Sequence, residues 1–199
     1  SITRPKGASW GVPQFAPPFQ VKTFWERACG KGVESTVLRW PLTFPAKGPG
    51  SVLGGLGVPD IRGRLADYSL YTTAAIPESD DKSRYRVPLS GGDKNYQGEL
   101  RGPAVSKNKF ATVPFQIACG DKEAAITVAG DSFVLKEHAW SDPVSLTFSP
   151  GLFRKVAGVG RFYLAKADDP LVLYFSPVAV DPEKPVFPIA APEGFSKKL

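Results

Sequence analysis

A series of short segments between residues 65 and 180 carries the β-branched and aromatic residues typical of strands, and turn-forming residues separate them. The segments are LADYSLYTT, SRYRVPL, YQGEL, TVPFQIAC, AAITVAG, SFVLKEHAW, VSLTF, GRFYLAK and LVLYFSPVAV. The turn signals between them are PESDDKS, SGGDKN, GDKE, AGD, SDP and ADDP. Because no long helical pattern follows residue 32, we predict an antiparallel β-rich module over residues 65–180.

The stretch before this module has a different character. TFWERACGKG, at residues 23–32, predicts a short helix, because Thr23 and Glu26 have the spacing of a capping box and glycines follow. STVLRW, at residues 35–40, predicts a buried strand. A helix, a glycine turn and a buried strand form the repeating unit of a parallel α/β sheet. One unit cannot make such a sheet, so we expect its partner strands to lie outside the chain.

The predicted fold class is therefore α+β and mostly β: a short helix–strand α/β element followed by an antiparallel β-rich module. The chain divides into four predicted parts: an extended Pro-rich arm (1–20), a fragment of an α/β core (21–64), the β-rich insert or cap (65–180) and a Pro-rich exit segment (181–199). The chain begins at Ser1 and contains no Met. We expect it to be one piece of a larger protein.

Composition narrows the classes of function. The net charge of +6 is spread along the sequence without a basic run, so we expect no nucleic-acid partner. No stretch is long and apolar enough to predict a membrane span. The sequence does not determine the compartment, although a periplasmic or secreted location is slightly favoured. Cys29 and Cys119 are either a disulfide pair or two free thiols, and with one His they cannot build a structural zinc site.

The glycine-rich stretch GGLGVPDIRGR, at residues 54–64, is the motif most suggestive of a ligand. It lacks the third glycine of a dinucleotide fingerprint and the Gly-Lys-Ser/Thr ending of a P-loop. Arg62 is able to hold a phosphate as a bidentate fork, and Asp60 to orient Arg62 or a substrate hydroxyl. The alternative is a tight turn in which Asp60 pairs with Arg62 and nothing binds.

Other candidate catalytic groups have structural interpretations. His138 is the only histidine, and no serine lies in a Gly-x-Ser-x-Gly elbow. The carboxylate pairs Asp80–Asp81 and Asp168–Asp169 both lie in turn-like contexts, where Asp commonly bends the chain. We predict no catalytic residue and no metal ligand in this chain.

Five stretches in order resemble one family. TFWERACGKGVESTVLRWPLTFP, GGLGVPDIRG with YSLYTT, WSDPVSLTF, GVGRFYLAK and LYFSPVAVDPEKPVFPIAAP are similar to segments of type I phosphodiesterase/nucleotide-pyrophosphatase-like phosphohydrolases of the alkaline phosphatase superfamily. The resemblance covers roughly residues 20–199. The sequence departs from the family pattern at Arg64, Ala66 and Asp67, where small residues, Gly or Thr are usual.

The resemblance implies that this chain is the middle of such an enzyme. Family members hold two divalent metals, typically zinc, and attack phosphorus with Thr or Ser. Their nucleophile and metal ligands belong to segments before and after the part that this chain resembles. The resemblance thus implies a non-catalytic portion that shapes the pocket for a phosphorylated substrate, with Asp60 and Arg62 facing that substrate. Its partners would be the missing catalytic-core segments or another protein chain.

A second hypothesis remains open. The chain is then a non-enzymatic structural or protein-binding module within a larger assembly. The unpaired helix–strand unit and the Pro-rich ends leave apolar surface that a partner would cover. A sibling chain or flanking sequence carrying an Asp/His metal set favours the first hypothesis, and its absence favours the second.

Overall fold

The computed structural model describes residues 2–3, 14–16, 21–65, 67–76, 85–107, 109–152 and 154–198. The chain forms two compact units. Unit 1 consists of residues 1–59 and 180–199, and unit 2 consists of residues 60–179. The fold is mostly β, as the sequence predicts, and its helical elements are short.

Unit 1 contains the predicted helix–strand pair. Helix α1 (Phe24–Cys29) begins after Thr23, whose hydroxyl oxygen accepts from the backbone N–H of Glu26, and the Glu26 carboxylate accepts from the backbone N–H of Thr23. The predicted capping box is therefore confirmed. Strand β3 (Thr36–Trp40) pairs in parallel with β4 (Ser51–Gly54).

The strand predicted at residues 35–40 is confirmed as β3, but the prediction that it is buried is wrong. Of the five residues of β3, only Val37 is buried, and it packs with Trp25, Ala46 and Val52 in the small core of unit 1. β3 lies at the end of a three-stranded sheet in the order β17–β4–β3. Side chains of a strand point to the faces of its sheet, and Leu38 and Trp40 are 52% and 50% exposed, so no layer of the described residues covers them.

The segment predicted as an exit folds back into unit 1. Strand β17 (Ala190–Ala191) pairs antiparallel with β4, and the 3₁₀ helix η2 (Phe195–Lys198) follows it. At the other end, β1 (Ile2–Thr3) pairs with β2 (Gln14–Phe15). The ring of Phe15 packs edge-on against Phe44 and Phe187. Most of the predicted Pro-rich arm lies outside the described residues.

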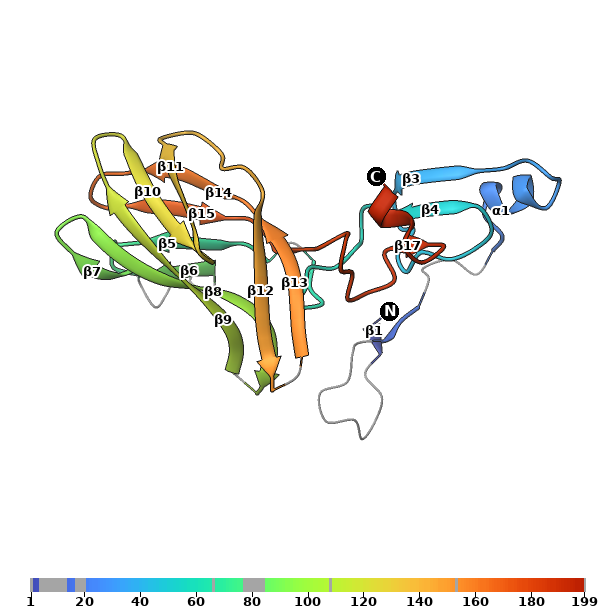
Figure 1. The fold of residues 1–199 in the computed structure, drawn as a ribbon, viewed down its shortest axis with the longest axis horizontal. Coiled ribbons are helices and arrows are strands. Elements are labelled where there is room, and N and C mark those ends of the chain that lie inside the picture. The colour runs from blue at the N-terminus through green and yellow to red at the C-terminus, as the bar shows by residue number, and fades with distance from the viewer. Residues whose placement is uncertain are drawn as a thin grey trace. The chain divides into compact units, whose positions relative to one another are not determined.

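Unit 2 is built from sheets whose strands match most of the predicted segments (Figure 1). The first sheet, in the order β11–β10–β9–β8–β7, is antiparallel throughout. Its strands are β7 (Ser90–Gly92), β8 (Asn95–Ser106), β9 (Lys109–Cys119), β10 (Glu123–Val128) and β11 (Asp131–Lys136). Residues of β10 alternate between exposed and buried, as expected for a strand with one face on a core.

A second sheet of unit 2 has the order β14–β15–β5–β6 and contains one parallel ladder, between β5 and β6. Its strands are β5 (Ser69–Thr72), β6 (Arg86–Pro88), β14 (Phe162–Lys166) and β15 (Val172–Phe175). The buried aromatic rings of Tyr71, Phe115 and Phe162 join this sheet to the first. These contacts form the main core of unit 2.

A third ladder joins β12 (Val144–Gly151) to β13 (Arg154–Gly160). The sequence patterns did not predict β13. Glycines of β13 sit where a larger side chain would collide: a Cβ on Gly158 would lie 2.6 Å from Val178 and 3.0 Å from Ile61. The chain leaves unit 2 at β16 (Ala179–Val180).

Candidate functional site

Asp60 organises the turn that follows the glycine-rich stretch. Its carboxylate oxygen Oδ1 accepts from the backbone N–H groups of Arg62 and Arg64, both at 2.9 Å. The turn is closed by two backbone hydrogen bonds, from Asp60 N–H to Arg64 O (2.8 Å) and from Gly63 N–H to Asp60 O (2.9 Å). Gly63 has φ of +76°, which suits a residue without a Cβ. This is an Asx turn, the local structure that Asp favours.

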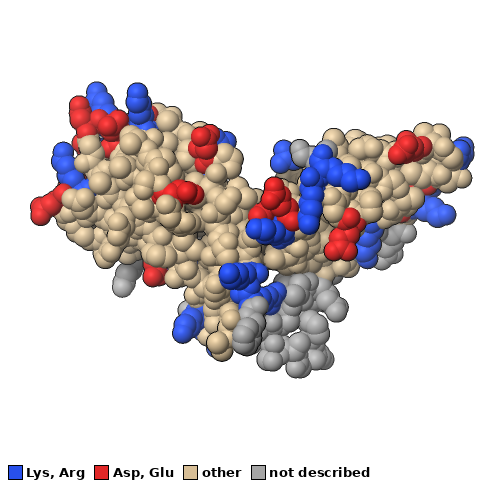
Figure 2. Space-filling view, in the orientation of Figure 1, with Lys and Arg blue, Asp and Glu red and all other residues tan. Residues whose placement is uncertain are grey.

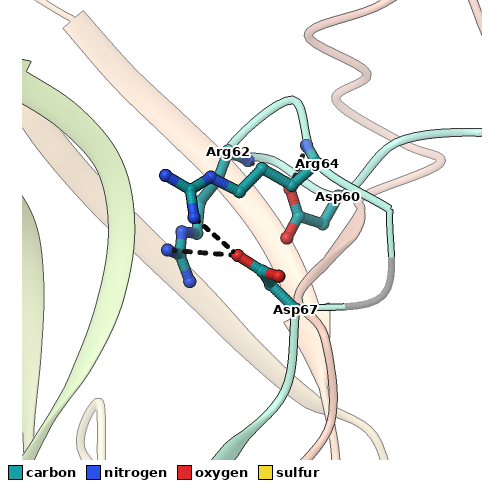
Figure 3. A network of polar contacts seen from close by, with 4 residues as sticks. All are labelled: Asp60, Arg62, Arg64 and Asp67. Atoms are coloured by element: carbon teal, nitrogen blue, oxygen red, sulfur yellow. Dashed lines mark hydrogen bonds and ion pairs between the residues drawn. The ribbon is translucent and has the colours of Figure 1, made fainter. Parts of the chain in front are cut away.

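The two arginines of this turn converge on one carboxylate (Figure 3). Arg62 Nη2 lies 3.5 Å from Asp67 Oδ2, and Arg64 Nη1 donates to the same oxygen at 2.9 Å. Arg62 is also held over the ring of Phe110, 5.4 Å from the ring centre. The side chain of Arg62 is 13% exposed, whereas that of Arg64 is 58% exposed, so the cluster is open to solvent on the Arg64 side.

Burial dominates the electrostatics of the cluster. Asp60 is 4% exposed, and loss of solvent raises the pKa of its carboxyl despite the hydrogen bonds from Arg64 and Arg62. Burial likewise lowers the pKa of Arg62, partly offset by the nearby charge of Asp60. Asp60 Oδ2 and Arg62 Nε are buried and have no hydrogen-bond partner among the described residues. Two polar atoms of the cluster therefore retain unused hydrogen-bonding capacity.

The structure brings the predicted site residues into one turn, but with roles that differ from the pairing considered in the sequence analysis. Asp60 binds the backbone of Arg62, while the guanidinium of Arg62 faces Asp67. Sequence reasoning missed Asp67 and Phe110 as neighbours of Arg62. The three-residue spacing of Arg64 and Asp67 was an available signal for their ion pair, whereas nothing in the sequence placed Phe110 beside this turn.

The glycines preceding Asp60 are accounted for by close packing within unit 1. A Cβ on Gly54 would lie 2.9 Å from Val58, and one on Gly55 would collide with the backbone of Arg39. The N–H of Gly55 donates to Thr43 Oγ1 at 3.1 Å, so it is already paired. These contacts explain the glycines without a ligand, and they leave the arginine cluster as the candidate site.

The other candidate residues from the sequence analysis make contacts that belong to the fold rather than to a site. The backbone N–H of His138 donates to Leu164 O at 2.7 Å, and Asp169 accepts from the hydroxyl of Thr73 at 3.2 Å. Asp80 and Asp81 lie outside the described residues. Cys29 belongs to unit 1 and Cys119 to unit 2, and both are free thiols in the structure. Burial raises the pKa of the Cys119 thiol, which disfavours the reactive thiolate.

The described residues do not fit the metal centre that the resemblance implies for a parent enzyme. Within the described ranges, no group of three or more His, Cys, Asp or Glu side chains is placed to hold a metal ion. In the face shown in Figure 2, Lys and Arg side chains form separate small groups, several of them beside Asp or Glu. No helix in the described part of the chain is long and apolar enough to cross a membrane.

Comparison with known proteins found no relative of this chain. No family model matches the chain, and neither the curated proteins nor the solved structures contain a match to it. The candidate site is therefore interpreted from its own geometry and from the sequence motifs that surround it.

Proposed function

We propose that this chain is a non-catalytic portion of a metal-dependent phosphohydrolase or phosphodiesterase and that it shapes the pocket for a phosphorylated substrate. The observation that carries the proposal is the pair of guanidinium groups at Arg62 and Arg64, held in a turn by buried Asp60. Arginine is well suited to phosphate, because its planar fork of N–H donors matches the oxygen atoms. The five sequence stretches that resemble phosphohydrolase segments, in the same order along the chain, support a phosphorylated substrate as well.

In this proposal the two site residues have separate tasks. Arg62 contacts the phosphate of the substrate, and its position is fixed by Phe110 and Asp67. Asp60 acts through the turn, because Oδ1 is committed to two backbone N–H groups. The nucleophile and the two divalent metals belong to catalytic-core segments that complete the enzyme, so the chain by itself is inactive.

The incomplete sheet of unit 1 supports a role as part of a larger structure. Strand β3 pairs in parallel with β4 on one side and has no partner on its other side among the described strands. Parallel sheets normally have both faces covered. Beside β3, however, Leu38 is 52% exposed, Trp40 50% and Phe24 60%. A hollow of about 410 Å³ lies along this strand, and the same three residues are among those that line it, together with polar residues such as Glu34 and Ser35.

The exposed apolar residues also favour the second candidate, a non-enzymatic structural or protein-binding module. Both candidates predict a partner at β3, but only the first predicts phosphate binding at Arg62. Sedimentation of the wild-type chain and of Leu38→Lys tests the shared part. Because the isolated chain lacks its partner, we expect the uncovered apolar edge to drive concentration-dependent self-association, which the lysine variant weakens. Equal association of the two chains would contradict a role for this edge.

Phosphate binding by the 199-residue chain separates the two candidates. We expect inorganic phosphate to shift the NMR signal of the Arg62 side-chain Nε–H, with a dissociation constant on the order of 1 mM. Arg62→Gln removes the charged donor and should weaken binding about tenfold or more. Arg154→Gln is the matched control, because Arg154 is an exposed arginine on β13 of the same unit. Equal weakening by both variants would overturn the proposal.

A further inference from the structure

One carboxylate oxygen contacts both arginines of the candidate site. Asp67 Oδ2 lies 2.9 Å from Arg64 Nη1 and 3.5 Å from Arg62 Nη2 (Figure 3). Each guanidinium carries five N–H donors, so this single oxygen leaves most of them without an acceptor from Asp67. Arg62 Nε in particular is buried and has no hydrogen-bond partner among the described residues. The cluster therefore offers more donors than its internal anion uses.

A phosphate group can accept hydrogen bonds from more of these N–H donors than a carboxylate can. It presents several strong acceptor oxygens, and bidentate contacts to arginine add geometric fit to charge attraction. The Asp67 carboxylate lies at the position where an oxygen of a phosphate group would contact both guanidinium groups. The Asp67 side chain is 19% exposed and its partner Arg64 is 58% exposed, so an ion from solvent reaches the pair from that side.

We propose that Asp67 is an internal anion that occupies the Arg62–Arg64 site and that a phosphate dianion binds there by replacing it. The inference rests on the proposed function, because the ligand is the phosphate group of the proposed substrate. Asp67 thereby sets the affinity of the site: it keeps the two positive charges together when no substrate is bound, and it competes with phosphate when substrate arrives.

The sequence carries the same pairing. Arg64 and Asp67 stand three residues apart, and in the structure they bind each other at 2.9 Å. The arginine and the aspartate of this ion pair compensate each other in charge. This compensation would keep the site close to neutral until an external anion displaces the carboxylate.

The test measures phosphate affinity by NMR titration of arginine Nε–H signals at pH 7.5 and fixed ionic strength, in wild-type, Asp67→Asn and Asp121→Asn chains. Asp67→Asn removes the competing charge and should tighten binding about fivefold, which corresponds to about 1 kcal/mol. Asp121→Asn changes the net charge of unit 2 equally at an exposed turn and should alter affinity less than about twofold. Asp67→Ala, with folding checked by circular dichroism, should give the same direction as Asp67→Asn.

The outcomes separate this inference from the proposed function. Tighter binding by both Asp67 variants, with no change in the control, supports the inference. If wild type binds phosphate through Arg62 and neither Asp67 variant binds more tightly, the competition by Asp67 is refuted while the proposed function stands. If none of the chains binds phosphate, both are refuted. If the control tightens binding as much as Asp67→Asn, the effect belongs to net charge and the inference is refuted.

Discussion

Replacement of Asp60 tests whether its carboxylate acts by holding the turn. Asp60→Ala removes the acceptor of two backbone N–H groups at 2.9 Å, in a residue that is 4% exposed. A buried donor left without a partner costs about 1–3 kcal/mol, and these two donors are partly buried, so each should cost less than the upper end of that range. Removal of a buried carboxylate that has one unpartnered oxygen offsets part of this cost. We expect a net loss of about 2–4 kcal/mol, a large share of the roughly 5–15 kcal/mol that stabilises a typical domain.

Asp60→Asn is the matched variant, because it keeps an oxygen that accepts both N–H groups and removes the charge. We expect it to lie within about 1 kcal/mol of wild type at pH 7. The assay is urea unfolding followed by far-UV circular dichroism, with a lower midpoint and an unchanged slope for Asp60→Ala. An asparagine variant as unstable as the alanine variant would refute the reasoning, because charge rather than the acceptor would then hold the turn.

Three further predictions test the structure independently: the pH dependence of the stability difference between wild type and Asp60→Asn, and the effects of two other substitutions. Burial raises the pKa of Asp60 above its ordinary value of about 3.9, so native protein holds this proton more tightly than unfolded protein. Stability of wild type relative to Asp60→Asn should therefore fall as pH rises through the native pKa, and a rise would contradict the assigned direction. Burial raises the pKa of Tyr71 to about 12, so absorbance titration should show one tyrosine that ionises later than the others and is missing in Tyr71→Phe. Gly158→Ala should destabilise unit 2 by about 1–3 kcal/mol in urea, because its methyl would lie 2.6 Å from Val178, and an unchanged midpoint would show that β13 relaxes freely.

Local signals in the sequence predict much of this fold. The Thr23–Glu26 spacing predicts the start of α1, and its capping box is present. Runs of β-branched and aromatic residues mark most strands of unit 2, since their side chains alternate between core and solvent. The turn at Asp60 is also local, because Asp binds backbone N–H groups two and four residues later and Gly63 permits the positive φ.

Structural features that depend on residues far apart in the sequence could not be predicted from local patterns. Strand β13 contains Gly158 and Gly160, which suggest a loop, yet the reason for both glycines is the nearness of Val178 and Phe175. Burial of β3 was predicted wrongly, because the burial of its side chains depends on which layers pack on the faces of the sheet, and the residues of the strand alone do not specify those layers. The contact between Arg62 and Phe110 joins the turn to β9, and no local pattern encodes it.

The measurement that tests the central claim most directly is a titration of the 199-residue chain with p-nitrophenyl phosphate, with zinc or manganese present and then with a chelator. NMR signals of the arginine Nε–H groups report binding, and absorbance of p-nitrophenolate in the same samples reports hydrolysis. The account predicts a shift of the Arg62 signal that saturates, with no metal-dependent release of product. Absence of any shift at Arg62 would contradict the phosphate site. Hydrolysis that the chelator abolishes would contradict the claim that catalysis resides in other segments.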